Sequence, residues 1–295
     1  MKPNSLKYGD TIGIISPCIA LTPEYFATPL SVLESKGFKV KLSENIFKNT
    51  HGYAASEKER ADDFNSMISD DNVKMILFGG GYVCNEILPF IDFENIKMHS
   101  KIICSYSDGT ALLNIIYSIT GLITYYGQSP KTFNQLTDYN YSHFKANFMS
   151  MHENEFEKTG EWLTICTGAC EGTLIGGYIE NFALLLGGQY FSYDNKSKYI
   201  LFLEDHEKFS KPERVSMLLS HIEQSKFMKN VTGILFGHYS LNKSTELINI
   251  LKRCGERNHI PVVSCDDFGH GINNAILPIG LPAKMDANTQ KLMFV

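Results

Sequence analysis

The first 130 residues alternate short apolar runs with segments of helical spacing, and this alternation restricts the fold more than any other feature of the sequence. The predicted strands are 11–16, 38–42, 73–78, the run that leads into Ser107, and 123–126, and the predicted helices are 23–36, 57–68, 85–91 and 111–119. Strands that alternate with helices pair in parallel, because each crossover helix returns the chain to the same edge of the sheet. We therefore predict an α/β fold with a parallel sheet, whose site lies beyond the carboxyl ends of the strands.

The segment 101–110 combines the end of an apolar strand, a tight turn at Ser107 and the start of a helix. Ser105 and Gly109 are small residues two positions either side of Ser107, as a sharp reversal requires when the central side chain must project from the backbone. The pattern predicts a nucleophile elbow, in which amides at the start of the helix, that of Asp108 first, stabilise an oxyanion. The alternative is an ordinary strand-to-helix loop with a serine or aspartate cap.

A second domain is predicted after residues 131–162, a polar, aromatic and irregular segment that we interpret as a linker. The first domain, 1–130, carries the candidate nucleophile, and the second, 163–295, has more short strands. Its predicted strands are 163–167, 172–175, 199–203, 233–236 and 261–264, and its predicted helices are 179–186, 212–224 and 244–257.

The charge balance argues against nucleic acid as a partner. The chain has 295 residues, with 27 Lys and Arg against 32 Asp and Glu, so its net charge is -5, whereas proteins that bind phosphate backbones carry a basic excess. The sequence has no apolar run of membrane-spanning length, and its first residues lack the apolar core of a secretion signal. We therefore expect a cytoplasmic protein without a membrane partner.

Neither the cysteines nor the histidines show the spacing of a metal site. The cysteines number seven, which is odd and indicates reduced thiols rather than a disulfide framework. Cys166 and Cys170 are close in sequence, but no further ligand completes a set, and no histidine pair has the H-E-x-x-H spacing. Cys84 and Cys104 are interpreted as small buried hydrophobic residues. We predict neither a metal nor a cofactor.

A serine hydroxyl needs a base to act as a nucleophile, and the base needs an acid that orients it. His270 lies between two glycines, where its ring can approach a neighbour, and Glu204 ends an apolar strand, where its carboxylate can face an imidazole. Each has a simpler interpretation: Glu204 or Asp205 caps the next helix, and the histidine is structural.

A glycine turn follows the strand 73–78, and we predict that Gly80 or Gly81 supplies a second oxyanion donor.

Seven ordered blocks of the sequence resemble the LD-carboxypeptidase family of serine peptidases, which includes the microcin C self-immunity proteases. The blocks are 6–17, 80–81 with 88–92, 106–112, 174–177, 200–205, 233–237, and 268–271 with 277–280. The resemblance implies a triad of Ser107, His270 and Glu204 that hydrolyses an amide bond near the carboxyl terminus of its substrate. It also implies a homodimer, and a flavodoxin-like N-terminal α/β sandwich joined to a β-barrel-like C-terminal α+β domain.

Several positions depart from the pattern of the muropeptide carboxypeptidases and resemble the microcin C immunity branch. Gly79 stands where an arginine usually precedes the glycine pair, and Val83 and Asn85 alter the same turn. Tyr178 replaces an asparagine that usually follows a pair of glycines. We expect Asn85 and Tyr178 to contact the substrate.

An aminoacyl or peptidyl nucleotide presents a flat base, and stacking on an aromatic ring contributes about 1–3 kcal/mol per base. Trp162 is the predicted platform, with Tyr125, Tyr126 and Phe133 as further candidates. Two alternatives remain open. One is a muropeptide LD-carboxypeptidase of murein recycling, and the other is a ligand-binding homologue without catalytic activity.

Overall fold

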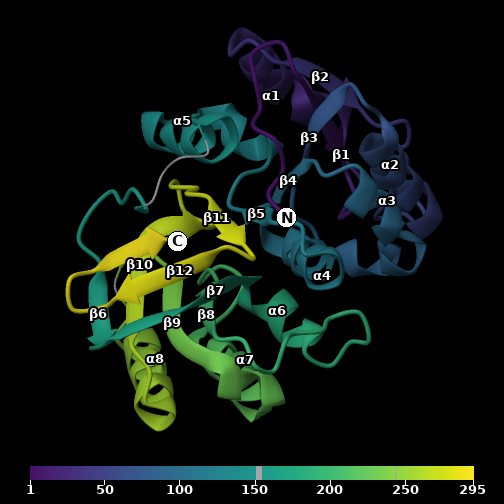
Figure 1. Ribbon diagram of the computed structural model, residues 1–295. Coiled ribbons are helices and arrows are strands. Elements are labelled where there is room, and N and C mark those ends of the chain that lie inside the picture. The colour runs from purple at the N-terminus through teal and green to yellow at the C-terminus, as the bar shows by residue number, and fades with distance from the viewer. Residues whose placement is uncertain (151–154, 243) are drawn as a thin grey trace.

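The computed structural model describes residues 1–150, 155–242 and 244–295, which form two sheets with their helices (Figure 1). The strands are β1 (Thr11–Ile15), β2 (Lys39–Leu42), β3 (Val73–Phe78), β4 (Ile102–Ser105), β5 (Thr124–Tyr126), β6 (Leu163–Cys166), β7 (Ala169–Tyr178), β8 (Tyr199–Glu204), β9 (Val231–His238), β10 (Val262–Gly269), β11 (Leu277–Ile279), β12 (Pro282–Asp286) and β13 (Lys291–Phe294). The α-helices are α1 (Pro23–Ser35), α2 (Glu57–Ser69), α3 (Phe93–Met98), α4 (Thr110–Thr120), α5 (Asp138–Phe144), α6 (Ile179–Leu185), α7 (Pro212–Gln224) and α8 (Thr245–Asn258). None of the helices in the described ranges combines the length and apolar character needed to cross a bilayer.

The first sheet has the strand order β11-β5-β4-β3-β1-β2, and the strands from β2 to β5 are parallel. The order 2-1-3-4-5 is that of flavodoxin-like folds. One face packs against Phe26 of α1 and Phe148, and the other packs against Phe64 of α2 and Ile116 of α4. Because both faces are covered, the inner strands β1, β3 and β4 are mostly apolar, whereas the edge strand β2 alternates lysines with apolar residues. The predicted parallel sheet is confirmed.

The second sheet has the order β13-β12-β7-β8-β9-β10-β6. Its four central strands are parallel, and α6, α7 and α8 connect them in turn, whereas β12, β13 and β6 pair in antiparallel fashion at the edges. The predicted class, mixed α/β with a second sheet domain, is confirmed. The three short strands at the carboxyl terminus and the short helix α3 were missed, because segments this short leave little periodicity to detect.

Residues 131–150, the first part of the predicted linker 131–162, are not irregular, which corrects the sequence interpretation for this part. They contain α5 and a π-helical turn, η4 (Lys145–Ser150), after the 3₁₀ turn η3 (Pro130–Gln135). Phe144 and Phe148 are fully buried, with ring centroids 5.6 Å from Phe38 and 5.0 Å from Tyr125, respectively. Phe144 and Phe148 therefore belong to the face that packs on the first sheet.

Strand β11 is an exception to a simple division of the chain at this segment. It lies late in the sequence, yet it pairs with β5 of the first sheet, with Leu277 opposite Tyr126. The side chain of Gln128 reinforces the connection, because its amide donates to the carbonyl oxygens of Asn140 and Asn274. The loop between β10 and β11 is thereby held beside the carboxyl end of β5.

Candidate active site

Ser107 lies at a sharp turn between β4 and α4, and its backbone φ is +56°. A non-glycine residue in this left-handed conformation costs about 1–3 kcal/mol unless its surroundings hold it there. The Ser107 N–H donates to the Tyr126 hydroxyl at 3.0 Å, and the Thr110 hydroxyl donates to the Ser107 carbonyl at 2.6 Å. Gly109 is required for the turn, since a Cβ there would overlap the Ser105 side chain. This is the geometry of a nucleophile elbow.

Side chains at the ends of three separate strands form a continuous hydrogen-bonded chain. Ser107 Oγ lies 3.0 Å from Nε2 of His270, and Nδ1 of His270 lies 2.9 Å from Oε2 of Glu204. Glu204 ends β8 and is fully buried, while His270 directly follows β10. Gly269 has a φ of +105°, and a Cβ there would lie 2.9 Å from Glu204 Oε2, so a glycine is needed for this close approach. The structure thus brings the three residues into the arrangement of a serine, a base and an orienting acid.

Burial and the neighbouring acids act in opposite directions on His270. Desolvation lowers the pKa of His270, but the charge and hydrogen bond of Glu204, with the charge of Asp205, more than offset it, so the pKa is raised. The acids therefore stabilise the imidazolium that forms when the ring takes a proton from a serine hydroxyl.

Asp205 is a second buried carboxyl group at this site. One of its oxygens, Oδ2, has no hydrogen-bond partner within the described ranges, and burial raises the pKa of Asp205 to about 6. An unfolded chain releases this proton at a pKa of about 3.9. The stability that the protonated group contributes is therefore fully present below about pH 4 and is lost as the pH rises to about 6.

We expect Asp205→Asn to remove this pH dependence. The difference in the free energy of unfolding, variant minus wild type, should rise by about 2–3 kcal/mol between pH 4 and pH 7. The reason is that only the wild type has a buried group at position 205 that ionises over this range. Urea denaturation at a series of pH values measures the difference. A difference that does not vary with pH would show that Asp205 keeps an ordinary pKa.

Tyr126 is a functional candidate that the sequence analysis assigned to a different role. Its hydroxyl donates to Oε1 of Glu204 and accepts the Ser107 N–H, so it connects the acid to the backbone of the elbow. Burial, and then the charge of Glu204, raise the pKa of Tyr126 well above its ordinary value, so the hydroxyl remains a donor. The feature of the sequence that could have identified Tyr126 is its position at the end of β5, the strand next to the one that leads into Ser107.

The two segments predicted to bind an oxyanion lie on either side of Ser107. Asp108 directly follows it, and Gly80 approaches so closely that a Cβ there would lie 2.9 Å from Ser107 Oγ. Gly81 instead lies against the backbone of Cys18. The Asp108 carboxylate joins the two segments, because it accepts the N–H of Cys84 at 2.8 Å. Of the two predicted glycines, Gly80 is therefore the one beside the hydroxyl.

Replacing Gly80 by alanine should lower kcat at least about 100-fold, because the added methyl group displaces the hydroxyl or the turn, and losing one oxyanion donor costs about this much. Gly79→Ala is the matched control, since a Cβ there would meet only the Tyr25 hydroxyl, at an ordinary 3.6 Å. We expect that variant to stay within about threefold of wild type. Equal activity of the two variants in steady-state assays would exclude a special role for Gly80.

The elbow helix α4 docks on the second sheet at a pair of glycines. Asn114 donates to the Gly176 carbonyl at 2.8 Å, and the Tyr178 N–H donates to the Thr110 hydroxyl at 2.9 Å. A Cβ on Gly177 would overlap the Thr110 side chain. The glycine pair therefore allows the contact that sets Ser107, on the first sheet, against Glu204, on the second.

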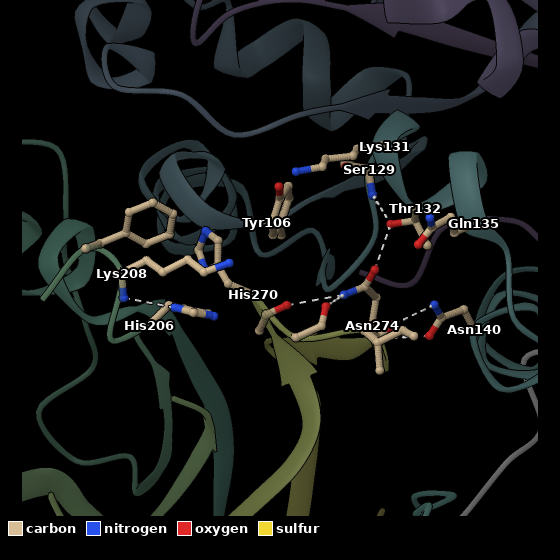
Figure 2. Close-up of a pocket in the computed structure, with 14 residues that line it drawn as sticks. Tyr106, Ser129, Lys131, Thr132, Gln135, Asn140, His206, Lys208, His270 and Asn274 are labelled. Atoms are coloured by element: carbon tan, nitrogen blue, oxygen red, sulfur yellow. Dashed lines mark hydrogen bonds between the residues drawn. The ribbon is translucent and has the colours of Figure 1, made fainter. Parts of the chain in front are cut away.

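A cavity of about 370 Å³ opens beside His270 (Figure 2). It is lined by Tyr106, Ser129, Lys131, Thr132, Gln135, Asn140, His206, Lys208, Phe209, Gly269, His270, Gly271, Ile272 and Asn274. Lys131 comes from η3 and Lys208 from the loop after β8, and the described lining contains no carboxylate. The cavity therefore favours an anionic ligand.

Three aromatic rings surround the His270 ring. The ring centroids of Tyr106, Tyr178 and Phe209 lie 5.2, 5.3 and 5.1 Å from it. Tyr178, which the sequence analysis assigned to substrate contacts, is thus next to the candidate base. Phe209 is 57% exposed, so its face is available to a ligand.

Two other predicted substrate contacts, Trp162 and Asn85, do not line this cavity. Trp162 is 4% exposed, and its indole N–H donates to Asp267 at 2.6 Å, so its ring belongs to the packing below β10. Asn85 is exposed on the 3₁₀ turn η1 (Cys84–Phe90) and is not part of the lining. Tyr125 and Phe133, the further candidates for a stacking platform, are buried in the core.

Residues 12–127 match the N-terminal domain of LD-carboxypeptidases, peptidase family S66, and residues 171–285 match the C-terminal domain of the same family. These matches cover more than half of the chain, which therefore belongs to the LD-carboxypeptidase family. The family predicted from the sequence is confirmed, and membership makes the chain a carboxypeptidase-type hydrolase.

Known relatives come from both branches of the family. A probable murein peptide carboxypeptidase of Bacillus subtilis is 33% identical over 297 residues, covering 97% of this chain and 91% of the relative. An MccF-like protein from Bacillus anthracis is 27% identical, with a TM-score of 0.90, covering 100% of this chain and 99% of that one. The microcin C7 self-immunity protein MccF in complex with aspartyl sulfamoyl adenosine is 26% identical, with a TM-score of 0.88, covering 99% of this chain and 98% of that one.

Proposed function

We propose that this hydrolase uses Ser107 as its nucleophile, His270 as its general base and acid, and Glu204 as the orienting acid. The observation that carries the proposal is the unbroken hydrogen-bonded chain from Ser107 Oγ through His270 to Glu204. His270, and Tyr106 next to Ser107 in sequence, line a cavity of about 370 Å³ that can hold a substrate. The substrate is an amide near a carboxyl terminus, as the family implies.

In the first half of the reaction, Ser107 Oγ attacks the carbonyl carbon of the amide while Nε2 of His270 takes the hydroxyl proton. The negative charge that develops on the carbonyl oxygen is stabilised by the amide N–H groups of Asp108 and Gly80. The tetrahedral intermediate then collapses, the carbon–nitrogen bond breaks, and His270 returns its proton to the leaving amine. The acyl group remains on Ser107 as an ester.

In the second half, His270 takes a proton from a water molecule, and the resulting hydroxide attacks the ester carbonyl. A second tetrahedral intermediate forms in the same oxyanion site. Its collapse releases the carboxylic acid and returns the proton from His270 to Ser107 Oγ. Throughout, Glu204 holds Nδ1 of His270 protonated and stabilises the imidazolium.

For the substrate class, we propose a peptidyl or aminoacyl nucleotide. Such a molecule carries an anionic linkage and a flat base, and the cavity offers Lys131 and Lys208 for the first, and the rings of Tyr106 and Phe209 for the second. The aspartyl sulfamoyl adenosine bound by MccF supports the proposal. These two rings take the place of Trp162 as the stacking platform.

A muropeptide is the second candidate substrate. A peptide with a free carboxyl terminus also suits two lysines, which bind a carboxylate as readily as a sulfamate. The murein peptide carboxypeptidase relative favours this alternative.

Measuring kcat/KM on both substrate types decides between the two. We expect an aminoacyl sulfamoyl adenosine to be cleaved at least about tenfold more efficiently than a murein tetrapeptide, because only the nucleotide uses both the lysines and the rings. Phe209→Ala should weaken cleavage of the nucleotide selectively, while Lys211→Met, an exposed lysine outside the cavity lining, should leave both substrates unaffected. Efficient release of D-alanine from the tetrapeptide without action on the nucleotide would assign the protein to murein recycling.

We also propose a homodimer and a cytoplasmic location, both of which the sequence led us to expect. Light scattering of the purified protein tests the first. Cell fractionation tests the second.

A further inference from the structure

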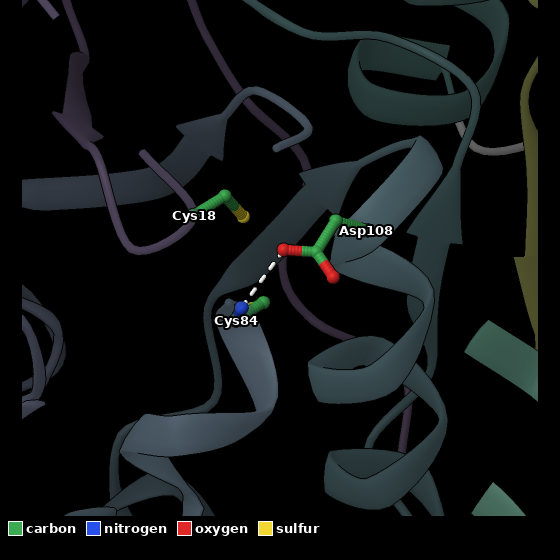
Figure 3. Close-up of side chains that lie close together, drawn as sticks. All are labelled: Cys18, Cys84 and Asp108. Carbon is green, nitrogen blue, oxygen red and sulfur yellow. Dashed lines mark hydrogen bonds between the residues drawn. The ribbon is translucent and has the colours of Figure 1, made fainter. Parts of the chain in front are cut away.

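Two thiols and a carboxylate lie close together (Figure 3), and the carboxylate belongs to Asp108, the residue that follows Ser107. The ligand atoms of Cys18, Cys84 and Asp108 all lie within 4.8 Å of one another, and all three residues are buried. They come from the loops that follow β1, β3 and β4, three neighbouring strands of the first sheet. In sequence they are too far apart for a metal motif to be recognised, so the sequence analysis did not predict this cluster.

We propose that Cys18, Cys84 and Asp108 form a binding site for a thiophilic divalent cation, of which Zn²⁺ is the physiological example, and that the bound ion inhibits the hydrolase. Two thiolates and a carboxylate are donors that zinc accepts in tetrahedral sites, with a water molecule in the fourth position. Zinc–ligand bonds of about 2.0–2.3 Å place the donors of such a site about 3–4 Å apart. Binding an ion therefore draws the most separated donors together by about 1 Å, a displacement that is small for the site but large for catalytic geometry.

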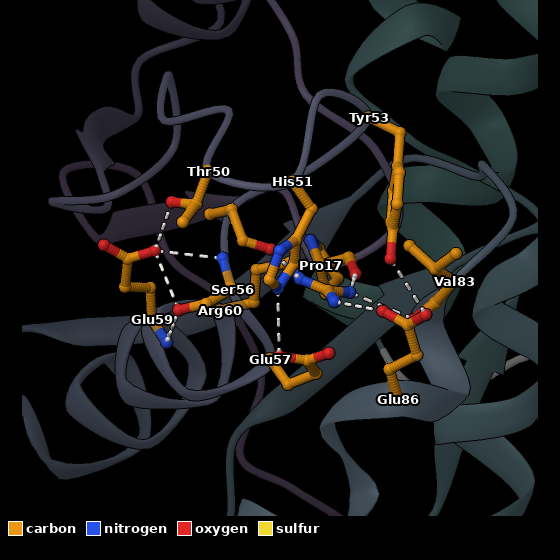
Figure 4. A network of polar contacts seen from close by, with 11 residues as sticks. Pro17, Thr50, His51, Tyr53, Ser56, Glu57, Glu59, Arg60, Val83 and Glu86 are labelled. Atoms are coloured by element: carbon orange, nitrogen blue, oxygen red, sulfur yellow. Dashed lines mark hydrogen bonds and ion pairs between the residues drawn. The ribbon is translucent and has the colours of Figure 1, made fainter.

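The loops that carry the two cysteines are fixed by one buried cation (Figure 4). The Arg60 side chain is 1% exposed and donates to the carbonyl of Pro17 at 2.6 Å and to that of Val83 at 3.0 Å. These residues directly precede Cys18 and Cys84. A donor set held in this way loses little conformational entropy when it binds an ion, which favours binding.

A cavity provides the access path that an ion requires. It has a volume of about 530 Å³ and shares no lining residue with the candidate substrate cavity. Its lining is Cys18, Ile19, Ala20, Asn49, Gly52, Tyr53, Tyr82, Val83 and Glu86. Of the three candidate ligands, Cys18 lines this cavity, although it is only 2% exposed. An ion that enters by this cavity therefore meets Cys18 first.

The cluster contacts the segments that carry the proposed oxyanion donors. The proposed inhibition rests on the hydrolase mechanism proposed above. Asp108 follows Ser107 directly, and Gly81 packs against the Cys18 backbone, to which Tyr82 also donates its N–H at 3.1 Å. An ion that draws the thiols and the carboxylate together moves both segments that flank the serine hydroxyl. It thereby misplaces the oxyanion donors without touching Ser107.

Cobalt(II) replaces zinc in such sites and reports its ligands directly, because bound thiolates give an intense charge-transfer absorption. We expect the purified full-length protein to bind one Co²⁺ with this absorption, and Zn²⁺ to displace it. Cys18→Ser and Cys84→Ser should each weaken cobalt binding at least about tenfold. Cys166→Ser and Cys170→Ser, the other pair of neighbouring thiols, are the matched controls and should bind as wild type does. Circular dichroism verifies that each variant is folded.

The absence of a thiolate band, or a band that persists in the Cys18 and Cys84 variants, would overturn the site. Inhibition is measured separately: one equivalent of Zn²⁺ should lower wild-type turnover about tenfold or more, EDTA should restore it, and Cys18→Ser should resist it. Cobalt binding with unchanged turnover would overturn the inhibition and keep the site. Failure of the proposed hydrolase mechanism would leave the cobalt spectrum intact, so the two failures are distinguishable.

Discussion

The Ser107→Ala variant should lose turnover by a factor on the order of 10⁴ or more, because the members of a triad act as a unit and the remaining groups cannot supply a nucleophile. The fold should be unaffected. The Ser107 hydroxyl contacts His270, whereas the backbone contacts that hold the turn, with Tyr126 and Thr110, do not involve the side chain. Steady-state kinetics with circular dichroism and a thermal melt as folding controls measure the effect.

Retention of a tenth of the wild-type turnover would exclude Ser107 as the nucleophile. Absence of activity in both the wild type and the variant, on nucleotide and murein substrates alike, would instead support the ligand-binding homologue. In that case, equal affinity of the two proteins for a substrate analogue would show that the cavity binds ligands without catalysis.

Glu204→Gln should reduce kcat by a factor of about 10³–10⁴. The two side chains have nearly the same size, so the packing should change little. The Tyr126 hydroxyl donates to Oε1 of Glu204 in the wild type, so it selects the glutamine rotamer that keeps the carbonyl oxygen there. The amide NH₂ group then faces Nδ1 of His270. The histidine must accept at Nδ1 and carry its proton on Nε2, where it can no longer take the proton of Ser107.

A double variant tests this explanation. With Tyr126→Phe also present, the glutamine is free to turn its carbonyl oxygen toward His270, so the double variant should be more active than Glu204→Gln alone. Tyr126→Phe by itself should lower kcat, because the Ser107 N–H loses its acceptor. Multiplicative losses in the double variant would mean that Tyr126 does not control the orientation at position 204.

The residues proposed to carry the reaction could be proposed from the sequence because each one stands at the end of a strand, and Ser107 and His270 also have glycines nearby. Ser107 follows β4 near Gly109, and His270 follows β10 between two glycines. In a parallel sheet these positions are brought to one edge by topology alone. The distance between Ser107 Oγ and His270 Nε2 required the structure, since the two residues are separated by 163 positions.

Other parts of the site depend on contacts that leave no pattern in the sequence. The Tyr126 hydroxyl is placed by the pairing of β5 with β4. In the sequence, a tyrosine at the end of a strand is as typical of a packing residue as of a functional one. Trp162 was expected to stack on a nucleotide base, but its indole is bonded to Asp267, a residue 105 positions away. Phe144 and Phe148 pack as part of a helical segment only when the sheet they cover is in place.

The central claim is that the reaction passes through an acyl group on Ser107, and covalent labelling followed by mass spectrometry tests it most directly. The protein is treated with a fluorophosphonate, which reacts with activated serine hydroxyls, and then digested. We predict a single adduct on the peptide that contains Ser107, accompanied by complete loss of turnover. The adduct should be absent from Ser107→Ala and should form much more slowly in Glu204→Gln. Full turnover after labelling, or an adduct at another residue that accounts for the loss, would contradict the proposed mechanism.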